Sequence, residues 1–568
     1  MFVRTAVRRN KDGTAVRYLQ LVHNEWDPVA KAAKMKVLHS FGREDQLDRA
    51  AIERLAGSLV RLLEPGRAAA LRAAPDLAYQ GSVAYGGPWL LDQLWQRLGI
   101  GEILAGRLAR TRRDRDTERV LFALVANRAL DPSSKLAAAH WVGRKAWIDG
   151  LPGTTDDACY RAMDWLHQAK DAVEKEIFAQ VAAVLDLEVD LLFFDTTSTY
   201  FEVDEEDQPV PRDKNGHLTD DEHKAAGGRP AGFRAYGKSK DHRDDLPQVV
   251  IGLAVTRGGI PVRVWCWPGN TADSALIRQV KDDMRDWTLA RVIWVADRGF
   301  TSAANRRHLR SGDHHYILGE KLRSGSAEAD AALSRQGRYQ DVAANLRVKE
   351  VRIADSERFV ICYNPDGAER DAAVRARMLT QLGELIHDSD KLSAAKRAEL
   401  RGVISTRPGL NRYLRVTPGG LLRADAAKTK AEENMDGKYL LRTSDPKLAA
   451  EDIALGYKQL LEVERGWRDL KQAIDLRPVY HRKEQRIRAH VILCWLALLL
   501  IRIAETATGT TWNNIADELD LLTLGTFTGP AGTFRQTAEL TSAQLDILAK
   551  LSIAPPKKII ETIPARLS

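Results

Sequence analysis

The spacing of apolar residues changes about a third of the way along the chain. From about residue 67 to residue 187 they recur every three or four positions, which predicts amphipathic helices, most clearly at 89–98, 118–129 and 171–185. From residue 188 continuous apolar runs take over, and the first of them is Leu191–Phe194. Such runs are typical of strands that are buried on both faces of a sheet. The pattern therefore predicts a helical region followed by an α/β region.

The α/β region has a recognisable order of elements. Strands are predicted at 249–255 and 261–266, and Arg257-Gly258-Gly259 between them is typical of a hairpin turn. A helix at 273–287 and a buried strand at 291–296 follow. Later the pattern predicts a strand at 437–442, a long helix at 448–473 and an apolar helix at 489–505. Hairpin strands followed by a β-α-β unit indicate a mixed sheet with helices on its faces.

These patterns divide the chain into six segments. Near the N-terminus two strands, at 16–22 and 36–39, are predicted around a turn at 24–28, and a helix follows at 47–63. Between the two halves of the core, short β runs surround a polar helical stretch, which indicates an inserted domain. The segments are a β-hairpin and helix unit (1–66), a helical region (67–187), the first part of the core (188–319), a β-rich insertion domain (320–436), the second part of the core (437–505) and a C-terminal helical tail (506–568).

Composition changes this picture only slightly. There are 85 Lys and Arg against 77 Asp and Glu, a formal net charge of +8, and such an excess is compatible with polyanionic partners without establishing one. Four scattered cysteines without a C-x-x-C pair argue against a zinc site or a disulfide framework. The longest strongly apolar run, Val491–Ile501, has 11 residues and is too short to cross a bilayer. We expect a soluble, cytoplasmic protein without a membrane partner.

Two aspartates each follow a buried strand. Asp195 comes directly after Leu191–Phe194, and Asp297 directly after the apolar residues Val292–Ala296. A carboxylate there is costly to desolvate unless it meets a cation or hydrogen-bond donors. Each aspartate taken singly has an alternative role as a helix N-cap. Two such aspartates at the ends of two core strands favour a shared site.

The third candidate acid is Glu464, on the predicted helix 448–473. Tyr457, Glu464 and Lys471 are seven residues apart, so they form one stripe of a continuous helix. An acid flanked by Arg468 and Lys471 is more often part of a solvated ion-pair face. Its placement against Asp195 and Asp297 is the alternative that would make it functional.

Three carboxylates suit metal-assisted cleavage of phosphodiesters. Two ions about 3.5–4 Å apart activate water and stabilise the leaving oxygen. Magnesium prefers hard oxygen ligands and keeps several waters, so carboxylates and substrate phosphate suffice without His or Cys. The same site can direct a DNA 3′-hydroxyl in place of water, which is strand transfer.

These motifs resemble those of the DDE transposases of bacterial insertion sequences, in the branch with a β-rich insertion. Asp297-Arg298-Gly299-Phe300 resembles the second-aspartate motif of that branch. Tyr457, Glu464 and Lys471 match its signature Y-x2-R-x3-E-x6-K. The opening Met1–Arg4 and the stretches 236–243 and 479–490 are also similar, so the resemblance covers most of the chain.

The resemblance implies a ribonuclease-H-like core with Asp195, Asp297 and Glu464 as catalytic residues. They would be the ligands of two Mg²⁺ ions, for which Mn²⁺ substitutes. It also implies that Tyr457 and Lys471 contact DNA phosphates, and that a homodimer holds paired element ends in a synaptic complex at the nucleoid. One departure is that Leu460 stands where the signature has arginine. Arg465 and Arg468 are candidates to compensate.

Charge alone adds further candidates for DNA contact, each with a solvated surface as its alternative. One group, in a glycine-containing stretch between the first core strands, includes Lys238, Lys240 and Arg243. A second follows the Glu464 helix and includes Arg482 and Lys483. A third basic run spans 107–115, in the helical region that we expect to help bind element ends. Trp467 could stack on an unpaired base, although a packed core position is the more common role.

We therefore predict a Mg-dependent DNA transposase that cleaves insertion-sequence ends and joins them to double-stranded target DNA. Three alternatives remain open. The first is a nuclease with the same core and no joining activity, and the second is a domesticated, non-catalytic DNA-binding regulator. The third is a sugar hydrolase with Asp195 and Asp297 as its carboxylate pair, which would leave the basic clusters without a purpose.

Overall fold

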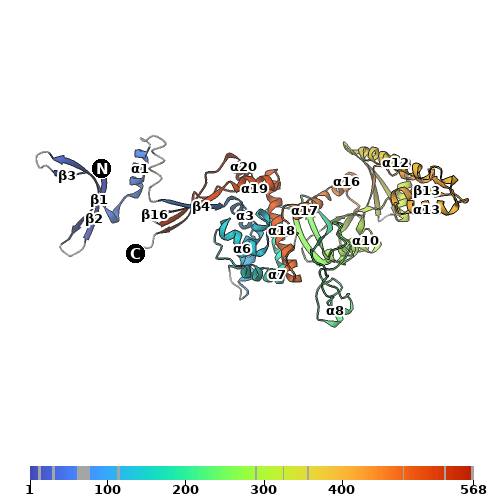
Figure 1. The fold of residues 1–568 in the computed structure, drawn as a ribbon, viewed down its shortest axis with the longest axis horizontal. Coiled ribbons are helices and arrows are strands. Elements are labelled where there is room, and N and C mark those ends of the chain that lie inside the picture. The colour runs from blue at the N-terminus through green and yellow to red at the C-terminus, as the bar shows by residue number, and fades with distance from the viewer. Residues whose placement is uncertain are drawn as a thin grey trace. The chain divides into compact units, whose positions relative to one another are not determined.

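The structure is a computed structural model, and Figure 1 shows its elements. It describes residues 1–564 except 11–14, 28–31, 61–76, 112–115, 288, 290, 324, 355–356, 478 and 530–531. The chain forms two compact units. One contains residues 1–81, 525–536 and 559–568, and the other contains residues 82–524 and 537–558.

The first unit is built mainly from strands. β1 (Phe2–Arg9), β2 (Ala15–Asp27) and β3 (Ala32–Arg43) form an antiparallel sheet, which α1 (Arg49–Val60) follows. A four-stranded sheet has the order β18 (Ile559–Pro564), β17 (Gly532–Thr537), β16 (Thr523–Gly529) and β4 (Ala78–Ala84).

The sequence patterns were wrong in two places here. Residues 24–27 of the expected turn belong to β2, because the ladder with β3 continues to the pair Asp27–Ala32; Pro28 lies outside the described residues. The tail 506–568 is not purely helical. It contains α19 (Trp512–Asp520) and α20 (Ser542–Lys550) together with three strands, because Thr and Phe recur in β16 and β17 where a helix would need a continuous apolar face.

The second unit begins with five helices, two of which pack closely against one apolar helix from later in the chain. The five are α3 (Gly86–Arg97), α4 (Ile100–Leu108), α5 (Thr117–Leu130), α6 (Lys135–Arg144) and α7 (Asp156–Val184). The apolar helix is α18 (Glu484–Thr508), which packs against α5 and α7 (Figure 1). α18 is long and apolar enough to cross a membrane, but its apolar stretch is entirely buried inside the fold, so it serves as a core helix.

A nine-stranded mixed sheet follows. Its order is β10 (Gln340–Ala343), β11 (Leu346–Ala354), β12 (Glu357–Tyr363), β15 (Lys438–Thr443), β9 (His315–Glu320), β8 (Ile293–Ala296), β5 (Leu191–Tyr200), β6 (Gln248–Thr256) and β7 (Pro261–Pro268). β5, β8 and β9 are parallel, and the other pairs are antiparallel. The predicted hairpin is confirmed, since Gly259 supplies the positive φ that the turn between β6 and β7 requires.

The sheet carries its helices on the connections between strands. α9 (Asp273–Asp283) and α10 (Ala303–Leu309) belong to the β-α-β part, while α16 (Ala450–Lys458) and α17 (Leu461–Gln472) follow β15. The predicted helix 448–473 is therefore two helices. Leu460 donates its N–H to the Tyr457 carbonyl three residues back, and this tight turn ends α16. The stripe Tyr457, Glu464 and Lys471 does not lie on one continuous helix.

The segment between β9 and β15 is both part of the sheet and a separate small body. Strands β10, β11 and β12 extend the central sheet through the pairing of β12 with β15. The remainder has its own apolar cluster, which includes Leu382, Ile404 and Tyr413. Its elements are α12 (Pro365–Ile386), α13 (Ala394–Ser405), α14 (Pro408–Asn411), β13 (Leu414–Val416), β14 (Leu422–Ala424) and α15 (Ala426–Glu433).

Candidate active site

Parallel pairing places the two aspartates side by side. In the register of β5 and β8, Phe194 is opposite Ala296, so Asp195 and Asp297 are the next residues on two neighbouring strands. Asp195 is not at the end of its strand, as its position after the apolar run predicted, because β5 continues to Tyr200 in its pairing with β6. It is instead the first residue beyond the parallel pairing, where β8 has ended.

α17 brings Glu464 to the same place, the edge of the sheet at which the parallel pairing of β5 and β8 ends. Gly466 lies against Leu253 of β6, since a Cβ at Gly466 would be 3.0 Å from Leu253 Cδ2. Leu253 is itself the cross-strand partner of Asp195. On the same helix Val463, Trp467 and Leu470 are buried, so Trp467 takes the core position. The buried face of α17 leaves Glu464 exposed.

Electrostatics couple the three acids. The pKa of Glu464 is raised from its usual value by partial burial first, and then by the negative charges of Asp195 and Asp297. Burial also raises the pKa of Asp195, with a further contribution from Asp297, although Lys240 opposes the shift. Among the residues that the structure describes, no three acidic, His or Cys side chains lie close enough together to hold a metal ion jointly. The three acids therefore interact electrostatically, but in this structure they do not form a common set of metal ligands.

Two further groups belong to this edge. Lys240 Nζ lies 3.6 Å from Asp195 Oδ1 and 3.5 Å from Asp273 Oδ2, so its ammonium bridges two acids. The Tyr457 hydroxyl donates to Asp297 Oδ1 at 3.2 Å. Burial and the charge of Asp297 raise the pKa of Tyr457, which keeps it a donor. Sequence reasoning missed Asp273, for which the only signal was its place at the start of the predicted helix 273–287.

Several predicted DNA-binding cations are committed to ion pairs. Lys471 Nζ lies 2.9 Å from Asp241 Oδ1, and Arg465 Nη2 lies 3.1 Å from Glu505 Oε2. Arg243 pairs with its neighbour Asp245 at 2.8 Å.

The remaining predicted cations are more open. Within the described part of the chain, four of them have no acidic ion-pair partner and are exposed: Lys238, Arg468, Arg482 and Lys483. In the basic run 107–115, Arg107 pairs with Glu176, and residues 112–115 lie outside the described residues.

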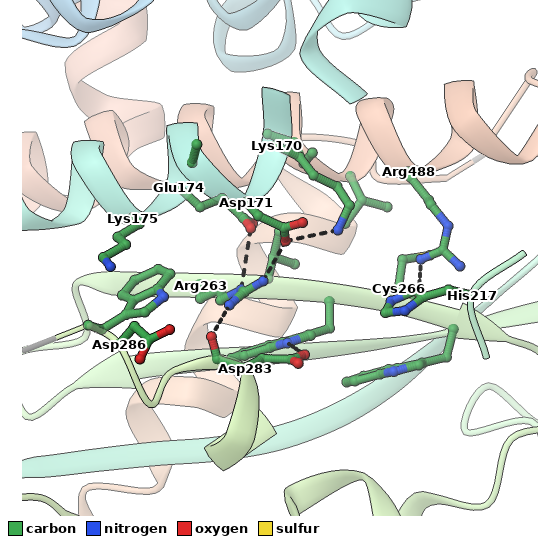
Figure 2. Close-up of a pocket in the computed structure, with 17 residues that line it drawn as sticks. Lys170, Asp171, Glu174, Lys175, His217, Arg263, Cys266, Asp283, Asp286 and Arg488 are labelled. Carbon is green, nitrogen blue, oxygen red and sulfur yellow. Dashed lines mark hydrogen bonds and ion pairs between the residues drawn. The ribbon is translucent and has the colours of Figure 1, made fainter. Parts of the chain in front are cut away.

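A pocket of about 370 Å³ lies along β7, beside α7 and the start of α18 (Figure 2). Arg263 lies at its centre, 2.7 Å from Asp171 and 3.4 Å from Glu174, and it donates to the Asp283 carbonyl at 2.7 Å. The charges at the centre of this pocket are thus paired with one another. β7 is also the edge strand, two strands from β5, so this pocket is separate from the three acids.

Comparison with known proteins identifies the family. Residues 203–500 match the transposase DDE domain, and residues 3–69 match the N-terminal domain of IS1634 family transposases. No curated protein matches the chain. The cryo-EM structure of the piggyBac transposase synaptic complex with hairpin DNA is 10% identical, with a TM-score of 0.34 over 77% of this chain and 80% of that chain. The DDE-domain match covers more than half of the chain and includes Asp297 and Glu464. The chain therefore belongs to the DDE transposases of bacterial insertion sequences, enzymes that cleave DNA and transfer its strands.

Proposed function

We propose that Asp195, Asp297 and Glu464 are the catalytic acids of this transposase and hold two Mg²⁺ ions during cleavage. The observation that carries the proposal is the placement of the acids. Asp195 and Asp297 directly follow the paired residues Phe194 and Ala296 of two neighbouring parallel strands, and Gly466 packs α17, which carries Glu464, against Leu253, the cross-strand partner of Asp195. The three acids repel one another and lie too far apart in this structure to hold an ion jointly; divalent cations would relieve the repulsion and draw the carboxylates together. DDE transposases use divalent metal ions, and hard carboxylate oxygens are the donors that magnesium prefers.

When bound, such ions lower the pKa of water and stabilise charge on the leaving oxygen. The protein's own side chains then have defined tasks. Tyr457 donates to Asp297 and so orients that carboxylate. Lys240 pairs with both Asp195 and Asp273 and so offsets the repulsion between these two carboxylates. The exposed cations Lys238, Arg468, Arg482 and Lys483 would bind phosphates of the DNA, as would Arg243, Arg465 and Lys471 once released from their acidic partners.

The proposed reaction is cleavage at the ends of the insertion sequence, followed by joining of the freed 3′-hydroxyl to target DNA. We further propose that the mixed sheet is ribonuclease-H-like, that the first five of the six segments describe functional domains, and that two copies pair the element ends at the nucleoid. The parallel strands β8, β5 and β9 with the antiparallel β6 and β7 on one side support this assignment. The region 67–187 would contact the ends.

The test is cleavage of a duplex that carries one terminal repeat of the element with flanking DNA, in buffer with and without Mg²⁺. Asp195→Asn and Glu464→Gln should each reduce cleavage to less than about a thousandth of the wild-type rate while end binding persists. Asp546→Asn, which removes an exposed acid of α20 that pairs with Lys550 outside the site, is the matched control. Wild-type cleavage by either site variant would refute the assignment.

The same preparation distinguishes the alternatives. Joining of a pre-cut end to a target plasmid separates a transposase from a nuclease, because only the former uses a 3′-hydroxyl as nucleophile. End binding without any Mg²⁺-dependent nicking would instead indicate a regulator that no longer cuts.

A further inference from the structure

A groove of about 410 Å³ opens beside Asp297, where the carboxyl ends of β8 and β9 meet the start of β15. We call it the Tyr439 groove. The basic and aromatic residues of its lining that carry the argument are Arg298, Lys321, Lys438, Tyr439 and Tyr457. Its volume lies within the range of about 300–1,000 Å³ that is usual for ligand sites. Arg298, Lys321 and Tyr439 take no part in the cleavage chemistry proposed above.

The charge of the groove is positive once paired groups are set aside. Of its two acidic residues, Asp297 and Glu320, the latter is buried and pairs with Arg442 at 3.4 Å. Arg323 is held by Glu432, to which its Nε donates at 2.8 and 2.9 Å. Arg298 and Lys321 are exposed, and within the described ranges neither has an acidic ion-pair partner. Two unpaired cations therefore face solvent at a wall that also contains Asp297.

An aromatic surface joins these cations to the catalytic edge. The rings of Tyr439 and Tyr457 are stacked, with centroids 6.1 Å apart and planes 27° apart. The Tyr457 hydroxyl reaches Asp297, and a Cβ at Gly319 would lie only 2.4 Å from that hydroxyl and 3.3 Å from the Arg298 backbone nitrogen. Tyr457 and Asp297 thus belong both to the groove and to the proposed active site. A DNA strand positioned at the acids would extend directly into the groove.

We propose that the Tyr439 groove binds the phosphodiester backbone of the DNA strand adjacent to the cut, with Arg298 and Lys321 as positioning residues. The inference rests on the proposed function, because it takes the three acids as the place of cleavage. The groove also supplies cations for DNA phosphates that α17 lacks. Leu460 is apolar, Arg465 is paired with Glu505 and Lys471 with Asp241. Arg468 is thus the open cation of α17, and the groove adds Arg298 and Lys321 to it.

The test uses the full-length protein and the terminal-repeat duplex, with a single neutral methylphosphonate placed at each phosphate in turn around the cut. Wild type should lose about tenfold in cleavage rate at one or two positions. The double variant Arg298→Ala and Lys321→Ala should lose at least that much on unmodified DNA and show no further loss at those positions. Its binding should also depend less steeply on salt, by about one unit of slope for each phosphate that the variant no longer binds.

Two controls keep the result interpretable. Arg257→Ala removes the same charge from an exposed residue that pairs with Asp190 just before β5, and it should retain the wild-type rate and interference pattern. Lys321→Arg should restore what Lys321→Ala loses, because it returns the charge without touching Asp297. The inference is overturned if the double variant matches Arg257→Ala, or if it keeps the wild-type sensitivity at every phosphate. Failure of Glu464→Gln to abolish cleavage would refute the proposed function instead.

Discussion

Substitution of Gly466 tests whether the packing of α17 places Glu464 at the catalytic edge. A Cβ at this position would be 3.0 Å from Leu253 Cδ2 and 3.8 Å from Leu498 Cδ2. Leu253 pairs across the strands with Asp195, and Glu464 is two residues before Gly466. Any side chain that forces α17 away from β6 must therefore separate Glu464 from Asp195.

The packing distances set a graded expectation. Gly466→Ala adds one methyl group, which Leu253 can accommodate by a shift of a few tenths of an ångström, and the gain in helix propensity of about 1 kcal/mol offsets the strain. Gly466→Val adds two further carbons toward the sheet. Overpacking of this kind costs about 1–3 kcal/mol, and a displacement of about 1 Å at a catalytic group reduces the rate about 100-fold. The valine variant should stay folded and lose most of its cleavage.

Cleavage of the terminal-repeat duplex and thermal unfolding should be measured for both variants. Gly402→Val is the matched control, because Gly402 lies in α13 and a Cβ there meets nothing within 4 Å. It carries the same β-branched penalty in a helix without touching the sheet. If Gly466→Val cleaves as fast as Gly402→Val, α17 does not position Glu464, and the reasoning is refuted.

Three further predictions concern buried or coupled charges. Burial raises the pKa of Glu174 to about 7, so the folded state keeps a proton that the unfolded state releases above pH 4.5. Wild type should therefore lose about 3 kcal/mol of stability between pH 4.5 and 7. Urea midpoints compared at pH 5 and 8 should show this loss in wild type and not in Glu174→Gln. Burial lowers the pKa of Lys135 to about 7, so stability falls as pH drops from 10.5 to 7, and Lys135→Met should raise the melting temperature at pH 6 by more than at pH 10. Asp195→Asn should stabilise the metal-free protein by about 1 kcal/mol in urea unfolding, because burial and Asp297 disfavour the ionised acid; destabilisation would contradict this.

Much of the sheet could be predicted because its strands are buried on both faces. Leu191–Phe194 and Ile293–Ala296 are continuous apolar runs in the sequence and neighbouring parallel strands in the fold. The outer strands of the sheet were harder to predict. β11 largely alternates polar and apolar residues, and β12 contains the continuous apolar run Phe359–Tyr363. Both patterns predict strands, but neither shows that the strands join the core through β15.

The break between α16 and α17 could not be predicted for a related reason. Gln459 and Leu460 are good helix formers, and Leu460 is buried. Tertiary packing, with Tyr457 against Asp297 and Gly466 against Leu253, overrides the local preference, and a tight turn separates α16 from α17.

The site was predictable only in part, because pairing between distant residues decides which charges are available. Asp195 and Asp297 could be identified from local pattern alone. Nothing near Lys471 in the sequence indicates that Asp241, 230 residues away, accepts its charge. Nor does any local pattern indicate that Arg298 and Lys321 lie unpaired on the same groove wall.

The ion pairs on the far side of α17 explain why the helix can present an acid to other acids. Asp469 pairs with Arg502 of α18 at 2.7 Å, and Arg502 pairs with Glu505, which also holds Arg465. Arg502 is almost fully buried, so this network contributes more to fixing the register of α17 against α18 than to net stability. Because these ion pairs fix α17 against α18, the helix cannot rotate to relieve the repulsion between Glu464 and the two aspartates. Glu464 is therefore kept near Asp195 and Asp297 at an electrostatic cost, which is the arrangement that a cation-dependent site requires.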